Sequence, residues 1–373
     1  MDNSAHIPPA VLKKFLLGFS GNSLSREMIE MLGSGLAGVT IFRRNFKNPD
    51  ELLRLTYEIR DAAEGAVLIG IDQEGGTKFA LPDPFTQWPS AAELGELNDA
   101  EAVEAVARAI ARELLAVGCN LVFAPMLDLH LRAGSPVTTD RSFGSDPELV
   151  GELGAAFARG LAAEGIFGCA KHFPGHGDAA ADPHLDLPIF EGTLERLREM
   201  ELVPFAEVIK AGVPTVMTAH ILLPWIDPGR PATLSRRVVE NLLRQELNFK
   251  RVVLADDLGM GAIAKQFPSG AAAVECFRAG CDIAMLCHDW SLVMPALTAT
   301  VRAFEKGEFR PAAWKGSLGR IDKLLGGRGK TPAKRTGLDV IGCAEHRGLA
   351  RELRARIIQI GRASCRERVF LSV

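Results

Sequence analysis

The sequence of 373 residues has no strong excess of either charge. It contains 43 lysine and arginine residues against 46 aspartate and glutamate residues, so its formal net charge is -3 at pH 7. A chain with this balance has no general attraction for nucleic acid or for an anionic membrane. We therefore expect neither as a partner, and any site for an anion must be local.

Long apolar runs are also absent. No stretch approaches the roughly 20 apolar residues of a membrane-spanning helix, and the N-terminal residues MDNSAHIPPAVLKKF contain no apolar core like that of a signal peptide. The seven cysteines are scattered and odd in number, which favours reduced, buried thiols over a disulfide framework or a metal cluster. We therefore expect a cytoplasmic protein.

Glycine-rich turns that bind phosphate are missing as well. No GxGxxG motif follows the first expected strand, which makes a doubly wound open sheet only the runner-up fold. Residues 326–331, GGRGKT, resemble a phosphate-binding loop, but Leu324 stands where the motif GxxxxGKT requires its first glycine. Nucleotide binding through either motif is thereby disfavoured.

What the sequence does contain is a series of short apolar runs, each followed by a longer segment. Two of these segments, 48–64 and 235–247, show helical periodicity, and the second begins with a serine that could cap it. Eight strands alternating with helices predict an α/β fold of the (β/α)8 TIM-barrel type. The apolar runs are 13–21, 35–42, 66–74, 120–128, 167–175, 214–220, 251–257 and 282–288.

Polar residues stand at the ends of six of these runs. The carboxyl ends of barrel strands converge on one face, where the following loops build the active site. We therefore expect these residues to lie together. They are Asp72 and Glu74, Asp128, Lys171 and His172, His220, Asp256 and Asp257, and His288.

The loop KHFPGHGDAAADPHLDLP, residues 171–188, holds three histidines. His172, His176 and His184 could together ligate zinc, although the fixed charge of Lys171 beside them would repel a dication. This alternative therefore requires a metal to bind next to a lysine.

A second interpretation of the loop is acid–base catalysis. Asp182 and His184 are two residues apart, in a segment made irregular by Gly177 and Pro183. This spacing lets the carboxylate accept a hydrogen bond from one imidazole nitrogen while the other nitrogen faces a substrate. The residues alone leave acid–base catalysis, a metal site and a solvated polar loop open.

Several motifs, in order, resemble one family. They are DQEGG (72–76), FAPMLDL (123–129), DRSFGSDP (140–147), KHFPGHGD with DxHxxLP (171–188) and ADDLGM (255–260). Together they resemble the β-N-acetylglucosaminidase branch of glycoside hydrolase family 3, over roughly residues 10 to 325. The resemblance implies a (β/α)8-like barrel, in agreement with the strand count.

The resemblance also implies roles for single residues. Asp256 matches the nucleophile, a choice between Asp256 and Asp257 that strand alternation alone cannot make. His184 matches the acid/base, with Asp182 as its partner. Four further residues match positions that hydrogen-bond the terminal sugar: Asp72, Arg141, Lys171 and His172. Glu74 and Asp128 are expected to tie strand ends together, His176 to brace the loop, and His220 to lie behind the site.

These roles imply an exo-acting, retaining hydrolase of terminal N-acetylglucosamine in small saccharides, with a covalent glycosyl-aspartate intermediate and no metal or organic cofactor. The resemblance also implies that the substrates are cell-wall fragments in which N-acetylglucosamine is linked to anhydro-N-acetylmuramic acid. Two alternatives stay open: a phosphorylase that uses the same intermediate, and a noncatalytic sugar-binding barrel. The sequence does not indicate an oligomeric state.

The sequence departs from the family pattern in two places. Thr77 and Ala80 stand where arginines are expected after DQEGG, and Lys78 lacks the planar fork of an arginine. At the other end, we expect residues 1–335 to form the catalytic barrel and 336–359 to form a linker and helix, 346–359, that could lead into a second domain. Residues 360–369, IGRASCRERV, resemble a translated sequencing adapter, so we expect a non-native tail over residues 360–373.

Overall fold

The protein is described by a computed structural model that covers residues 7–176, 179, 182–327 and 337–370, with side chains as far as residue 362. Gly177, expected to make the loop irregular, lies outside the described residues. So does the expected boundary between residues 335 and 336.

Eight parallel strands close into a barrel in sequence order, which confirms the predicted (β/α)8 fold. β1 pairs with β8 through Phe15 and Ala284, so that the sheet has no free edge. Each strand lies inside the run predicted for it. The strands are β1 (Phe15–Gly18), β2 (Gly38–Ile41), β3 (Leu68–Ile71), β4 (Leu121–Val122), β5 (Phe167–Phe173), β6 (Thr215–Thr218), β7 (Val252–Asp257) and β8 (Ile283–Leu286).

β4 is much shorter than the predicted run 120–128. Its ladder is interrupted before Pro125, which has no N–H to donate, and an isolated bridge then joins Met126 to Lys171. Asp128 therefore lies on the loop beyond β4 and not at the end of a continuous strand.

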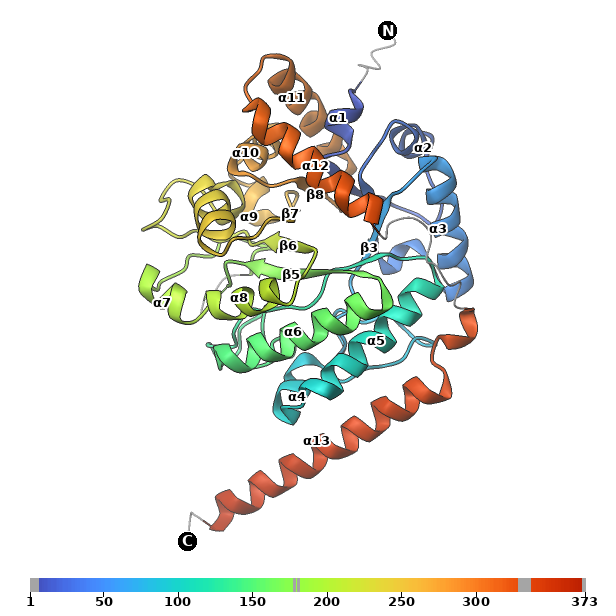
Figure 1. Ribbon diagram of the computed structural model, residues 1–373, viewed down its shortest axis with the longest axis vertical. Coiled ribbons are helices and arrows are strands. Elements are labelled where there is room, and N and C mark those ends of the chain that lie inside the picture. The colour runs from blue at the N-terminus through green and yellow to red at the C-terminus, as the bar shows by residue number, and fades with distance from the viewer. Residues whose placement is uncertain (1–6, 177–178, 180–181, 328–336, 371–373) are drawn as a thin grey trace.

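Helices surround the barrel (Figure 1). α3 closely matches the predicted helix 48–64 and is capped by the Asn48 side chain, which accepts a hydrogen bond from Glu51 N. The predicted helix 235–247 forms as the π-helix η3, and Ser235 Oγ accepts a hydrogen bond from Val238 N at 3.4 Å.

The helical elements before β5 are α1 (Pro9–Leu12), α2 (Arg26–Gly33), η1 (Arg43–Asn45), α3 (Pro49–Ala63), α4 (Ala91–Leu97), α5 (Ala100–Ala116) and α6 (Pro147–Glu164). Those between β5 and β8 are α7 (Leu194–Glu199), α8 (Leu202–Lys210), η2 (Ala232–Leu234), η3 (Arg237–Glu246), α9 (Gly261–Ala264) and α10 (Ser269–Ala279). After β8 come η4 (Trp290–Leu292), α11 (Val293–Glu305), α12 (Pro311–Gly327), η5 (Leu338–Val340) and α13 (Ala344–Phe370).

Side chains inside the barrel alternate with those that pack against the helices. On β3, β5 and β7, buried residues of the inner cluster are Leu68, Cys169, and Val252 with Leu254. Because the period of a strand is two, the same face continues toward the carboxyl end through Gly70 to Asp72 on β3, to Lys171 on β5 and to Asp256 on β7. Alternate strands of a TIM barrel contribute to the same layer, so the fold brings these three polar residues to one level of the barrel mouth.

The C-terminal helix is longer than expected. α13 runs to Phe370, beyond the predicted end at residue 359, and extends away from the barrel as one continuous helix (Figure 1). Its first half packs on α4 and α5, with Leu353 and Ile357 buried. That residues 360–373 form a non-native tail stays a prediction.

Two expectations about composition can be compared with the structure. In the described part of the chain, five cysteines are buried free thiols, as predicted: Cys119, Cys169, Cys276, Cys281 and Cys287. Cys343 is also a free thiol but is only half-buried. Within the described part of the chain, the structure contains no helix with the length and apolar character of a membrane span.

Candidate active site

One cavity at the carboxyl ends of the strands brings the predicted site residues together. Its floor is apolar and includes Phe123, directly after β4, Met217 of β6 and Met285 of β8. Polar side chains lie around this apolar floor. All seven predicted site residues line the cavity: Asp72, Arg141, Lys171, His172, Asp182, His184 and Asp256.

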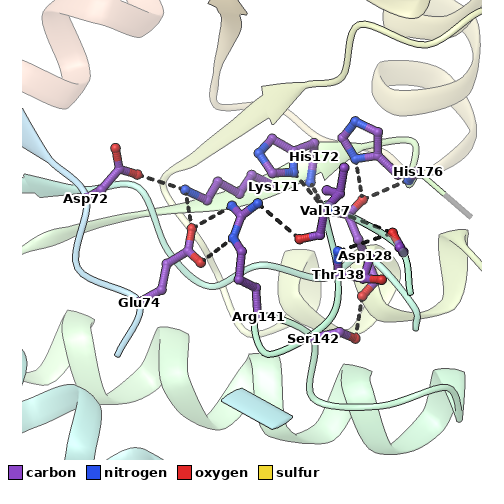
Figure 2. Close-up of polar contacts among 11 residues, drawn as sticks. Asp72, Glu74, Asp128, Val137, Thr138, Arg141, Ser142, Lys171, His172 and His176 are labelled. Atoms are coloured by element: carbon purple, nitrogen blue, oxygen red, sulfur yellow. Dashed lines mark hydrogen bonds and ion pairs between the residues drawn. The ribbon is translucent and has the colours of Figure 1, made fainter. Parts of the chain in front are cut away.

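A buried ion-pair network forms one wall of the cavity (Figure 2). The Glu74 carboxylate accepts two hydrogen bonds from Arg141, one from Nε and one from Nη2, both at 2.8 Å. Lys171 Nζ lies 2.6 Å from Glu74 Oε1. Lys171 also donates to Asp72 Oδ1 at 2.9 Å. Burial alone would raise the pKa of Glu74, but the two cations outweigh it and lower this pKa to about 2. The expectation that Glu74 ties strand ends together is thus confirmed.

Asp128 holds two histidines from behind the cavity (Figure 2). Its Oδ2 accepts from the backbone N and the Nδ1 of His172, at 3.3 and 2.7 Å, and its Oδ1 accepts from the same two groups of His176, at 2.8 and 3.1 Å. Burial opposes ionisation, but these donors prevail and keep the pKa of Asp128 well below its usual value. His176 is therefore the loop brace that the sequence predicts.

This arrangement corrects the zinc alternative built on three histidines. The residues whose ligand atoms come together are Asp128, His172 and His176, whereas His184 pairs elsewhere. Both Nδ1 atoms in the group are directed at the Asp128 carboxylate at hydrogen-bond distance, which fits N–H donors and not two lone pairs sharing a cation. Burial also lowers the pKa of His172, which favours a neutral ring with its proton on Nδ1.

The two neighbouring aspartates at the end of β7 have different surroundings. Asp256 is on the inward face and accepts a hydrogen bond from Asp257 N at 2.8 Å. Burial alone would raise the pKa of Asp256, but the neighbouring imidazoles and the backbone N–H outweigh it, so this pKa lies below its ordinary value.

Asp257 is engaged by the backbone instead. Its Oδ1 accepts from Gly259 N at 2.9 Å and from Cys287 N at 3.1 Å, while burial raises its pKa. Its carbonyl oxygen lies 2.9 Å from His220 Nε2, which places His220 directly behind the site, as expected. The surroundings of Asp256 therefore favour its ionised form, while Asp257 shapes the turn after β7.

Asp182 and His184 form the predicted pair. His184 Nδ1 lies 2.8 Å from Asp182 Oδ1, and the same oxygen accepts a hydrogen bond from His184 N at 2.9 Å. Burial would raise the pKa of Asp182, but the hydrogen bonds from His184 outweigh it and lower this pKa. The side chain of His184 is 58% exposed, so its ring can meet a ligand at the open end of the cavity.

Aromatic residues at the site were missed by the sequence reasoning. Phe79 lies under three cations, with Arg141 Cζ 4.3 Å, Lys171 Nζ 5.5 Å and Lys78 Nζ 5.8 Å from the ring centroid. Across the cavity, Phe42 packs on His288, with ring centroids 4.6 Å apart. Phe42 ends the apolar run 35–42, and Phe79 follows Lys78 in the segment after DQEGG, where the sequence analysis considered only the missing arginines.

The departures after DQEGG also have a structural outcome. Lys78 and Phe79 line the cavity, whereas Thr77 and Ala80 do not belong to its described lining. Lys78 Nζ donates to Pro136 O at 3.1 Å. The lysine is thus present at the site, but as a single donor and not as the fork of an arginine.

Comparisons with known proteins agree with this geometry. Residues 15–324 match the model of the glycosyl hydrolase family 3 N-terminal domain. A β-hexosaminidase from Stenotrophomonas maltophilia is 36% identical over 312 residues, covering 82% of this chain and 91% of that protein.

Solved structures give the same result. A family 3 β-N-acetylglucosaminidase from Paenibacillus sp. matches with a TM-score of 0.88 and 36% identity, over 94% of this chain and 68% of that chain. NagZ from Neisseria gonorrhoeae, in complex with N-trifluoroacetyl-D-glucosamine, matches with a TM-score of 0.76 and 30% identity, over 92% and 98% of the two chains. This chain belongs to glycoside hydrolase family 3 and is a glycosidase.

Proposed function

We propose that this glycosidase is an exo-acting β-N-acetylglucosaminidase that removes terminal N-acetylglucosamine with retention of configuration. One observation carries the proposal. Asp256, at the end of β7, and His184, on the loop after β5, line the same cavity together with Asp72, Arg141, Lys171 and His172. The noncatalytic alternative is not favoured, because the relatives are hydrolases and both reacting groups are present together.

In the first step, the ionised Asp256 attacks the anomeric carbon and forms a glycosyl ester. The bond to the leaving oxygen breaks, and that oxygen takes the proton from Nε2 of His184. Asp182, at 2.8 Å from Nδ1, holds the ring in this orientation and stabilises the imidazolium before the transfer. The lowered pKa of Asp256 supports its role, because a nucleophilic carboxylate must be deprotonated.

In the second step, the neutral His184 accepts a proton from water. The resulting hydroxide attacks the anomeric carbon, the ester bond to Asp256 breaks, and the sugar leaves with its original configuration. One imidazole thus performs the two roles that a second carboxylate performs in most retaining glycosidases.

Binding of the terminal sugar is assigned to the polar wall of the cavity. Asp72 can accept from sugar hydroxyls, and Lys171 and Arg141 retain N–H donors beyond those used by Glu74. His172, with its proton on Nδ1, presents Nε2 as an acceptor. Because each of these groups is already held by a protein partner, little rotamer entropy is lost when a sugar binds.

The substrates that we propose are peptidoglycan fragments in which N-acetylglucosamine is linked to anhydro-N-acetylmuramic acid, hydrolysed in the cytoplasm. Support comes from the family relationship and from the NagZ structure that holds an N-acylglucosamine derivative.

Phosphorolysis is the alternative reaction, which the relatives, named as hydrolases, do not favour. An imidazole does not repel an incoming phosphate as a second carboxylate would, and His184 is an exposed residue that lines the cavity. In phosphorolysis, a phosphate oxygen would attack the anomeric carbon, the ester bond to Asp256 would break, and the sugar 1-phosphate would be released.

One experiment tests the proposed function and its alternative together. The protein is incubated with an aryl β-N-acetylglucosaminide, with and without 10-fold excess inorganic phosphate, and the products are followed by proton NMR. We expect the β-anomer of free N-acetylglucosamine to form first, at a rate independent of phosphate. Formation of the α-anomer as the first product would refute retention. Formation of a sugar 1-phosphate would show that the enzyme is a phosphorylase and not a hydrolase.

A further inference from the structure

The loop that carries His184 rests on the element directly after the nucleophile strand. Ala262 N donates to Pro183 O at 3.1 Å, and Gly261 N donates to His184 O at 3.2 Å. Both donors belong to the first turn of α9, whose early N–H groups have no partner inside the helix. The main chain of His184 is thereby fixed to the segment that follows β7.

Gly261 makes this contact possible because it has no side chain. A Cβ atom at this position would lie 2.6 Å from His184 O and 2.8 Å from Leu185 O, closer than carbon and oxygen atoms approach without displacement. Gly261 starts α9 in a helical conformation, which any residue can adopt. The need for glycine is therefore imposed by the loop above it and not by its own backbone angles.

The turn beneath the loop is itself held firmly. Asp257 Oδ1 accepts from Gly259 N, and Met260 N donates to Asp257 O at 3.0 Å. The hydrogen bond from Cys287 N to Asp257 Oδ1, at 3.1 Å, ties the same turn to the end of β8. Asp256 and the docking platform for His184 thus lie on one continuous, hydrogen-bonded segment.

We propose that Gly261 is a positioning residue that sets the location of the His184 imidazole relative to Asp256. The inference rests on the proposed role of His184 as the acid. Proton transfer requires the imidazole to be within hydrogen-bond reach of the leaving oxygen, and displacement by about 1 Å can lower the rate 10²-fold. A methyl group at residue 261 displaces the loop backbone, while the sugar-binding wall and Asp256 stay in place.

The test compares three variants on two substrates. Gly261→Ala is measured beside His184→Ala and beside Gly319→Ala, a control in α12 where an added Cβ meets nothing within 4 Å. One substrate is 2,4-dinitrophenyl β-N-acetylglucosaminide, whose leaving group needs little protonation. The other is the methyl glycoside, whose leaving group needs a full proton.

We expect Gly261→Ala to lower kcat/KM for the methyl glycoside by about 10- to 100-fold and for the dinitrophenyl glycoside by less than about 3-fold. His184→Ala should show the same pattern with a larger loss, and Gly319→Ala should match the unchanged protein on both substrates. Binding of an N-acetylglucosamine-type inhibitor by Gly261→Ala should be unaltered, because the sugar-binding wall is not touched.

A structural readout accompanies the kinetics. Hydrogen exchange at the backbone amides of residues 261 and 262 should be faster in Gly261→Ala than in the unchanged protein, because their acceptors, His184 O and Pro183 O, are displaced. An equal loss on both substrates, no loss on either, or unchanged exchange would overturn the role of Gly261. If His184→Ala itself shows no dependence on the leaving group, the acid assignment fails, which is a different result.

Discussion

Replacement of Glu74 by glutamine should destabilise the fold strongly and in a pH-dependent way. The carboxylate is buried and pairs with two buried cations, so the glutamine leaves Arg141 without its ion-pair partner and Lys171 with Asp72 alone. The pKa of Glu74 is lowered from 4.5 to about 2, a difference that corresponds to about 3 kcal/mol at about 1.4 kcal/mol per unit. This agrees with the roughly 3–5 kcal/mol lost when a buried pair loses one partner.

The sign of the pH effect follows from the direction of this shift. Because the folded-state pKa of Glu74 is below its unfolded value, its contribution is complete above about pH 4.5 and is lost as the pH falls toward 2. The difference in unfolding free energy between the unchanged protein and Glu74→Gln should therefore shrink from about 3 kcal/mol at pH 7 to about 1–2 kcal/mol at pH 3.

Urea unfolding followed by circular dichroism at pH 7, 5 and 3 measures this difference. Glu104→Gln is the matched control, because Glu104 also contacts two arginines, Arg108 at 3.1 Å and Arg159 at 3.2 Å, but is 28% exposed. Surface ion pairs of this kind contribute about 0–1 kcal/mol. A cost for Glu74→Gln no larger than that for Glu104→Gln, or one that does not change with pH, would refute the reasoning.

Other variants separate the roles at the end of β7 and on the catalytic loop. Asp256→Asn should lower kcat by about 10⁴-fold or more in steady-state assays, with inhibitor binding retained. Asp257→Asn should leave turnover per folded molecule within about 10-fold of the unchanged protein. It should lower the free energy of urea unfolding by about 1–3 kcal/mol, because the new amide is buried among N–H donors. A large loss of turnover in Asp257→Asn and a small one in Asp256→Asn would exchange the two roles. Asp182→Asn should lower kcat/KM for the methyl glycoside more than for the dinitrophenyl glycoside, and an equal loss on both would contradict its support of His184.

The fold could be predicted from the sequence because its signals are local. Eight apolar runs give the strands, and the alternation within each run gives the inward face. The prediction was wrong for β4, which ends well before residue 128 because Pro125 has no N–H to donate. The helix predicted at 235–247 forms, with π-type hydrogen bonds that periodicity does not reveal.

The site could be predicted only in part. Asp182 and His184 are two residues apart, so their hydrogen bond follows from the local chain. The pairing of Glu74 with Arg141 and the contact of Gly261 with the loop join residues far apart in sequence. These contacts depend on how the barrel closes, which periodicity does not encode.

The central claim is that Asp256 is the nucleophile of a retaining glycosidase. The most direct measurement is to trap the intermediate with a 5-fluoro-N-acetylglucosaminyl fluoride, digest the protein, and locate the attached sugar by mass spectrometry. The account requires a single label on Asp256 and slow release of the sugar on dilution. A label on Asp257, or none on a protein that still binds the reagent, would contradict it.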